Sequence, residues 1–127
     1  SNSTTSINKQ LATYVASKIK EVSYDVADLN DFELPIFSLE IEAKGFPKAA
    51  QDFNELLGQY DGFVISLAEH NGSYSAVFKN TFPHLGGNVI ATFSLPNFYD
   101  SFKEGKIVNQ DLITALQEAI VKFQEAI

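Results

Sequence analysis

The stretch Gly62-Phe63-Val64-Ile65-Ser66-Leu67-Ala68 decides the expected fold of this chain. It is a nearly continuous apolar run, and turn-forming residues bound it on both sides, Asp61-Gly62 before it and Glu69-His70-Asn71-Gly72 after it. A run of this length is typical of a β-strand buried on both faces, as in a parallel sheet covered by helices.

Two further segments are strand candidates. Residues 88–95, with the sequence NVIATFSL, form a similar apolar run that ends at Pro96, and residues 24–29 are a shorter candidate. Pro35 makes the apolar segment 34–37 a loop or edge segment, because proline cannot donate to a sheet ladder.

Helical patterns alternate with these strands. Apolar residues at helical spacing predict a helix over about residues 7–20, capped by Ser6 or Thr5, and a second helix that Pro47 opens. A third helix is predicted over about 110–126, with Asn109 as its cap. Alternating helices and buried strands predict βαβ units and an α/β fold with a mainly parallel sheet. We find no linker or repeat, so residues 1–127 are expected to form a single domain.

The composition and net charge of the chain exclude several kinds of partner and chemistry. The 127 residues carry a net charge of −7, and an acidic surface repels phosphate backbones, so we expect no nucleic acid partner. No apolar run approaches the roughly 20 residues of a membrane helix, and the polar first residues do not resemble a signal peptide. We therefore expect a cytoplasmic protein without a membrane partner. Cysteine is absent, which excludes disulfides and thiolate chemistry.

Two segments could bind a ligand. Residues 1–8 are rich in hydroxyl groups and lead into a helix N-terminus, which is typical of a phosphate site, although a frayed polar terminus is the alternative. Residues 68–74 follow the strongest strand, and a planar ring could lie along their backbone; the alternative is a simple turn, since Asn71-Gly72 is a strong turn signal. A hairpin is disfavoured here, because residues 74–80 do not alternate cleanly.

The sequence lacks the motifs of a metal site, of a catalytic triad and of the common nucleotide-binding loops. His70 and His84 are not at a metal-binding spacing, and no GxSxG elbow supports a Ser–His–Asp triad, so we expect neither a metal site nor such a triad. The GxGxxG and GxxxxGK[ST] patterns are absent as well.

Five segments in order along the chain resemble the NAD(P)H-dependent FMN reductase family. The resemblance implies a flavodoxin-like fold, which is a doubly wound parallel sheet with helices on both faces. Residues 1–12, SNSTTSINKQLA, resemble the family's phosphate loop GSxRxxSxNxxLA, and residues 34–37 match its LPxF segment. Residues 68–73, AEHNGS, resemble its PEYNxS motif. The YDGFVIS stretch and residues 81–90, TFPHLGGNVI, also fit.

The resemblance implies FMN and NAD(P)H as cofactors. Hydroxyl and amide groups of residues 1–8 would surround the phosphate, and residues 68–72 would run beside the isoalloxazine ring. The cofactor-binding residues implied are Ser1, Ser3, Ser6, Ile7, Asn8, Ala68, Glu69, His70, Asn71 and Gly72.

The implied activity is transfer of electrons from a nicotinamide through FMN to a small-molecule acceptor, namely a quinone, azo compound, metal oxyanion or flavin. The resemblance also implies a homodimer or homotetramer. Two alternatives stay open: a flavodoxin-like FMN-binding electron carrier without nicotinamide turnover, and a scaffold that has lost the cofactor.

The number of strand candidates predicts that segments of the protein are missing from the given sequence. A flavodoxin-like sheet has the order 2-1-3-4-5, and the three candidate strands correspond to strands 2, 3 and 5, of which no two are neighbours. Strands pair at about 4.8 Å, so a missing strand leaves a gap that no hydrogen bond spans. We therefore expect that residues before Ser1 and between Asn80 and Thr81 were left out of the chain.

Overall fold

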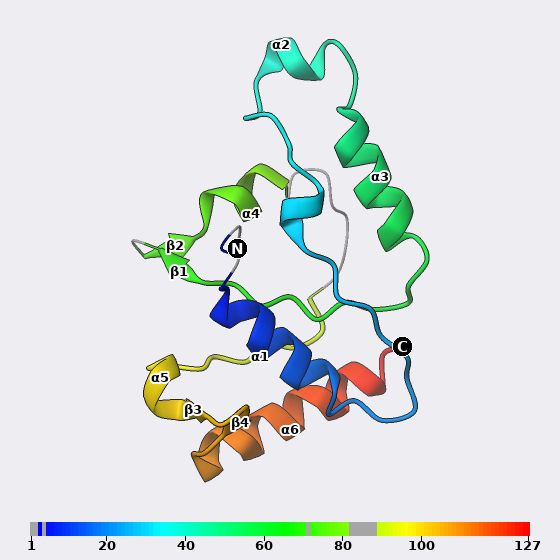
Figure 1. Cartoon of the computed structure of the whole chain (residues 1–127). Coiled ribbons are helices and arrows are strands. Elements are labelled where there is room, and N and C mark those ends of the chain that lie inside the picture. Colours follow the sequence, from blue (N-terminus) through cyan, green and yellow to red (C-terminus); the bar gives the residue numbers. More distant parts are fainter. Residues whose placement is uncertain (1–2, 4, 71, 82–88) are drawn as a thin grey trace.

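The structure is a computed structural model, and it describes residues 3, 5–70, 72–81 and 89–127, without the side chain of His70. The helices are α1 (Ile7–Ala16), α2 (Leu39–Glu42), α3 (Lys48–Leu57), α4 (Ala76–Thr81), α5 (Phe98–Ser101) and α6 (Gln110–Gln124), with a 3-10 turn, η1 (Leu29–Asp31). The strands are β1 (Glu69–His70), β2 (Ser73–Tyr74), β3 (Phe102–Lys103) and β4 (Lys106–Ile107). Figure 1 shows their arrangement.

The predicted N-terminal helix is confirmed as α1, and Ser6 is its cap. The Ser6 hydroxyl accepts a hydrogen bond from the Lys9 N–H at 3.3 Å, which satisfies one of the donors that a helix start leaves unpaired. The helix ends at Ala16 rather than near residue 20, because the chain leaves it through turns and reaches a positive φ of 60° at Glu21.

The other two predicted helices are confirmed with small changes at their ends. Asn109 caps α6 by accepting from the N–H groups of Asp111 and Leu112. Pro47 is itself the N-cap of α3, so that helix begins one residue later than expected, at Lys48. The short helices α2, α4 and α5 were not predicted, because four to six residues are too few to show a periodic apolar pattern.

The main core lies where α6 meets α1 and the β3–β4 hairpin. Its buried members are Phe102, Ile107, Leu116 and Ile120. Half-buried apolar residues of α1 pack against this cluster, and the Tyr14 ring meets the Phe102 ring edge-on at a centroid distance of 5.4 Å. Burial of this apolar surface stabilises the contact between the first and last helices.

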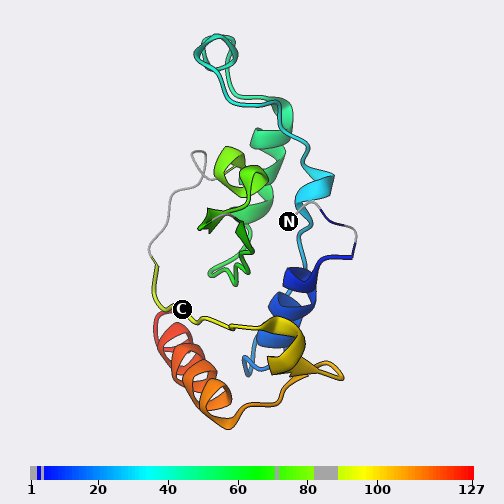
Figure 2. The ribbon, with the colours of Figure 1, turned by 90° about the vertical axis from the view of Figure 1, so that its left-hand side faces the viewer.

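Further buried residues lie outside this cluster, namely Ala50 and Phe53 of α3 and Phe78 and Thr81 of α4. The Phe53 ring lies 4.8 Å from that of Phe32. Figures 1 and 2 show α3 and α4 in the upper part of the molecule and α6 in the lower part.

The expected doubly wound parallel sheet is not found among the residues that the structure describes. Those residues pair only in two short antiparallel hairpins, β1–β2 and β3–β4. The predicted strands 24–29 and 63–68, and the described part of 88–95, run outside any strand, while residue 88 lies outside the description. The reason is the position of these segments in the expected sheet. They are not neighbours in the flavodoxin-like strand order, so none of them supplies a hydrogen-bonding partner for another.

The prediction against a hairpin at residues 69–74 is wrong. Glu69 pairs with Tyr74 and His70 with Ser73. The turn between them contains Gly72 at a φ of 73°, a conformation that glycine adopts without steric cost. Residues 74–80 do not alternate cleanly between apolar and polar side chains. A hairpin with two residues in each strand needs almost no such alternation, so the Asn-Gly turn signal was the better predictor.

The junction between Asn80 and Thr81 lies inside α4. The Thr81 hydroxyl donates to the Val77 carbonyl at 2.9 Å, one helical turn back. The Asn80 side chain donates to the Pro35 carbonyl and accepts from the Phe37 N–H, so it holds the 34–37 loop at two points. Direct pairing of the three predicted strands, which would contradict a missing segment here, is not found among the residues that the structure describes. The missing segments therefore stay a prediction.

We expect Leu116→Ala to lower the free energy of unfolding by about 2–5 kcal/mol, because it leaves a cavity in the main core. Leu116 is 4% exposed and Val121, on the same helix, is 52% exposed. Val121→Ala is the matched control and should change stability by less than about 0.5 kcal/mol. Urea unfolding followed by circular dichroism measures both. Equal losses in the two variants would show that α6 does not pack as described.

Candidate functional site

The start of α1 carries the first set of predicted site residues. Ser6 is the cap, Ile7 and Asn8 form the first turn, and Ser3 is exposed just before it, with its Oγ 3.4 Å from Oγ1 of Thr5. The first N–H groups of a helix have no acceptor within the helix, and the helix dipole makes this end partly positive. Together with nearby hydroxyl groups, such an end suits a phosphate or another anion.

A side-chain hydrogen bond joins this helix start to the second set of site residues. The Ser66 hydroxyl donates to Oδ1 of Asn8 at 2.9 Å, although the two residues are 58 positions apart. The bond is half-buried and fixes the end of segment 62–68 beside α1. It leaves the Asn8 Nδ2 amide without a partner among the described residues, so this group remains a donor for a ligand.

The second set of site residues lies immediately beyond this bond. Ala68 is half-buried and Glu69 is exposed, while Gly72 is exposed in the β1–β2 turn. The backbone of Glu69 and His70 is engaged in pairing with β2. Figure 1 shows the hairpin close to the start of α1. The fold therefore brings the two predicted segments together at one end of α1.

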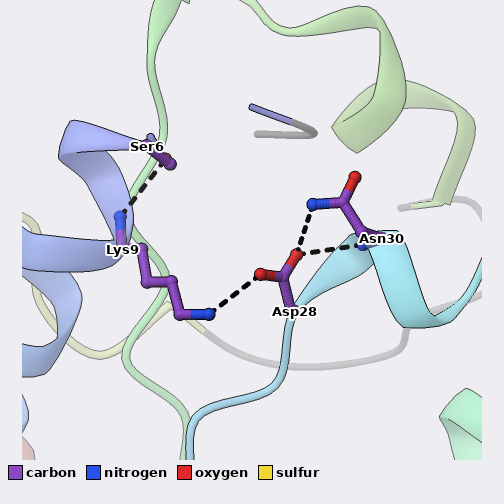
Figure 3. A network of polar contacts seen from close by, with 4 residues as sticks. All are labelled: Ser6, Lys9, Asp28 and Asn30. Atoms are coloured by element: carbon purple, nitrogen blue, oxygen red, sulfur yellow. Dashed lines mark hydrogen bonds and ion pairs between the residues drawn. The ribbon is translucent and has the colours of Figure 1, made fainter. Parts of the chain in front are cut away.

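A network of charged and polar side chains lies on the other side of the same helix start (Figure 3). The Lys9 ammonium forms an ion pair with Oδ2 of Asp28 at 3.0 Å. Oδ1 of Asp28 accepts from both the backbone N–H and the side-chain amide of Asn30. The backbone hydrogen bond from Asn30, followed by the interaction with Lys9, lowers the pKa of Asp28 below its ordinary value of 3.8.

The network determines the charge beside the candidate phosphate site. Lys9 is the basic side chain of the first turn of α1, and Asp28 neutralises it. Any phosphate here would therefore be held mainly by backbone N–H groups, hydroxyls and the Asn8 amide. Sequence reasoning did not identify Lys9, Asp28 or Ser66, because no local spacing links residues so far apart; only the Lys9 position next to Asn8 could have suggested a charged group there.

Two of the predicted site residues, Ser1 and Asn71, lie outside the described residues, and so does the side chain of His70. Of the others, the first turn of α1 and the 68–72 segment lie at the same end of the fold. The donors present are neutral or backbone groups, and this chemistry fits the phosphate and the polar ring edge of a flavin mononucleotide.

The described part of the chain offers neither a metal site nor a membrane-spanning helix. Residues 3, 5–70, 72–81 and 89–127 contain no cluster of three or more His, Asp or Glu side chains able to hold a metal ion. None of the helices in these ranges is both long and apolar enough to cross a membrane.

The fold and the site together define an α/β protein with a hydroxyl-bearing helix start beside a turn. Residues 1–108 match the NADPH-dependent FMN reductase family, and this match covers most of the chain. The chain belongs to that family, whose fold is flavodoxin-like. The match confirms the resemblance to this family that the sequence motifs indicate.

One relative with a known activity is also similar. The chain is 36% identical over 76 residues to a 2-hydroxy-1,4-benzoquinone reductase from Burkholderia sp., which is 59% of this chain and 40% of that protein. The aligned part of this chain thus spans less than half the length of the relative. None of the solved structures compared with the chain matches it.

We expect Asp28→Asn to lower the free energy of unfolding at neutral pH by about 0.2–1 kcal/mol, the usual contribution of an exposed ion pair. Because folding lowers the pKa of Asp28, its stabilisation is present above the ordinary value of 3.8 and is lost as the pH falls through the lower folded value. The difference between the variant and the wild type should therefore shrink in acid. Urea titrations across this pH range measure it.

Asp61→Asn is the control for that series, since Asp61 is an exposed carboxylate outside the network. It should leave stability nearly unchanged at neutral pH. A constant difference between Asp28→Asn and the wild type from neutral to acid pH would contradict the assigned role of the ion pair.

Proposed function

We propose that the protein is an FMN-dependent NAD(P)H oxidoreductase. Membership of the NADPH-dependent FMN reductase family supports this function. The observation that supports it is the hydrogen bond between Ser66 and Asn8, because it joins the first turn of α1 to the segment that leads into residues 68–72.

In this proposal, the chain binds and orients the cofactor. The N–H groups of Ile7 and Asn8, the hydroxyls of Ser3 and Ser6 and the Asn8 amide hold the phosphate. The backbone of residues 68–72 lies along the ring, and Ser1 and Asn71 complete the two segments. When bound, FMN supplies hydride acceptance from a nicotinamide and electron transfer to a second substrate. No side chain of the chain is assigned as a catalytic acid.

A small quinone is the acceptor class that we propose first. The relative from Burkholderia sp. is named for a benzoquinone, and the aligned 76 residues are 36% identical. In the overall reaction, a hydride from NAD(P)H and one proton from solvent reduce a quinone to a hydroquinone, and NAD(P)+ is released.

The proposal is tested by adding FMN to the purified protein and recording its absorption spectrum, its melting temperature and the oxidation of NADPH with a benzoquinone. We expect a flavin spectrum that stays with the protein through gel filtration, a raised melting temperature and quinone-dependent NADPH oxidation. A protein that FMN neither colours nor stabilises would contradict the proposal.

The acidic charge supports a second candidate, an FMN-binding electron carrier. A net charge of −7 would suit docking to a basic redox partner, which is a salt-dependent interaction. The same experiment separates the two functions: a yellow protein that does not oxidise NADPH would support the carrier.

We expect Ser6→Ala and Asn8→Ala each to weaken FMN binding by roughly tenfold, which corresponds to about 1.4 kcal/mol for a lost hydrogen bond to a charged group. Titration of the quenched flavin fluorescence measures the dissociation constants. Unchanged affinity in both variants would contradict the phosphate site at α1.

Asn109→Ala is the matched control for these variants. Asn109 caps α6 as Ser6 caps α1, so its loss should cost a similar 0.5–2 kcal/mol of stability. Since α6 is not part of the proposed site, FMN affinity should be unchanged. A control that weakens FMN binding as much as Ser6→Ala would mean that the effect comes from stability rather than from contact.

A further inference from the structure

The ion pair between Lys9 and Asp28 has one fixed partner and one movable partner. Asp28 caps η1, because its Oδ1 accepts from the backbone N–H of Asn30 at 3.0 Å and from the Asn30 side-chain amide at 2.8 Å. The Asp28 side chain is 23% exposed, whereas that of Lys9 is 53% exposed. Among the described residues, the Lys9 ammonium has no hydrogen bond other than that to Asp28. Lys9 is therefore the partner that can move when the pair opens.

Lys9 lies at the partly positive end of α1. It belongs to the first turn, whose residues Ile7-Asn8-Lys9-Gln10 include no acidic side chain, and the helix dipole disfavours a cation there. Helical side chains point back towards the N-terminus of their helix, so an ammonium in the first turn can reach an anion held at that end. In the free protein, Asp28 supplies the negative charge that both Lys9 and the helix end require.

Lys9 is also the cation on which the charge of the candidate site depends. Residues 1–12 and 68–74 contain no lysine or arginine other than Lys9. A phosphate monoester carries about two negative charges at neutral pH, and hydrogen bonds between ionised groups are stronger than those between neutral groups. Whether Lys9 is free or paired therefore decides whether these segments offer the phosphate a full positive charge.

We propose that Asp28 is a positioning residue that limits the affinity of the protein for the FMN phosphate, because it holds the Lys9 ammonium. Figure 3 shows the Lys9 side chain extended towards Asp28 and away from the Ser6 hydroxyl. Asp28 and the phosphate are then alternative anions for the same cation. This role rests on the proposed FMN site and deepens it, since it concerns how tightly that site holds the phosphate.

The pairing persists in the wild type because Asp28 is both held in place and ionised. The hydrogen bonds from Asn30 orient the carboxylate towards Lys9 without a further loss of side-chain freedom. The backbone hydrogen bond from Asn30, and then the interaction with Lys9, keep the pKa of Asp28 below its ordinary value of 3.8. The pair is therefore neutral as a whole near pH 7, and removal of either partner leaves one charge of known sign.

A cycle of charge variants, measured by titration of the full chain with FMN, tests this role. Asp28→Asn frees Lys9 and keeps a side-chain oxygen that can accept from the Asn30 N–H, so the cap of η1 is retained. We expect FMN to bind about three- to fivefold more tightly, which is the upper range for an exposed ion pair.

The other two variants of the cycle have opposite expectations. Lys9→Met leaves the Asp28 carboxylate unpaired beside the phosphate site and should weaken FMN binding by a similar factor of about three. The double variant Lys9→Met/Asp28→Asn is neutral at both positions, as the wild-type pair is. Its affinity should return to within about 1.5-fold of the wild type.

Two controls separate the role of the pair from other effects. Asp31→Asn removes a negative charge from the same 3-10 turn but leaves the pair intact, since Asp31 is exposed and lies outside it. FMN affinity should change by less than about 1.5-fold. Riboflavin carries the same ring without a phosphate, and its affinity should be equal in the wild type and the three variants of the cycle.

Salt provides a measurement that a merely structural role of Asp28 would not change. The interaction of an exposed ammonium with a phosphate is screened by added ions, so the tighter binding of Asp28→Asn should disappear by about 0.5 M potassium chloride. A change in the shape of the site would alter the affinity at high salt as well. Melting temperatures without FMN confirm that each variant is folded.

The outcomes distinguish this role from the proposed function. Equal FMN affinities of the wild type and Asp28→Asn would overturn the role of Asp28 and leave the FMN site intact. A double variant that keeps the tighter binding of Asp28→Asn would overturn it too, because the effect would not come through Lys9. Binding of FMN by Asp28→Asn but not by the wild type would support the role and contradict the proposed function, and binding by none of the proteins would contradict both.

Discussion

The packing of α6 against α1 and the β3–β4 hairpin is the interaction on which the rest of the structure depends. Leu116 and Ile120 of α6 are buried with Phe102 and Ile107, and they hold the last helix of the chain against the first. The far end of α6 also contacts segment 62–68: a Cβ atom added at Gly62 would lie 2.5 Å from Cζ of Phe123. The helix α6 thus contacts both α1 and the start of segment 62–68.

The polar contacts at the start of α1 leave no unpaired cation beside it. A neutral hydrogen bond joins Ser66 to Asn8, and the ammonium of Lys9 is paired with Asp28. Backbone N–H groups and hydroxyls are what remain for an anion, and they retain their donors at any pH. An acidic protein can hold a phosphate in this way without a basic patch.

The predicted strands 24–29, 63–68 and the described part of 88–95 remain unpaired for the same reason. Their sequences favour strands, but a strand is stabilised only when a neighbour supplies the other half of its ladder. The chain contains strand candidates that are not neighbours in the flavodoxin-like order, so pairing in the described part of the chain is limited to hairpins formed by residues close in sequence.

The sequence by itself determined the local features: the caps Ser6 and Asn109, the helices that follow them, the loop at Pro35 and the two segments that could meet a flavin. These depend on side chains and backbone groups only a few residues apart, and for that reason a pattern reveals them. It also predicted strands that the described residues do not form and missed the hairpin at Gly72. Only the tertiary structure decided which segments meet. The bonds from Ser66 to Asn8 and from Lys9 to Asp28 join residues far apart in sequence, and contacts of this kind depend on how the helices pack around the core.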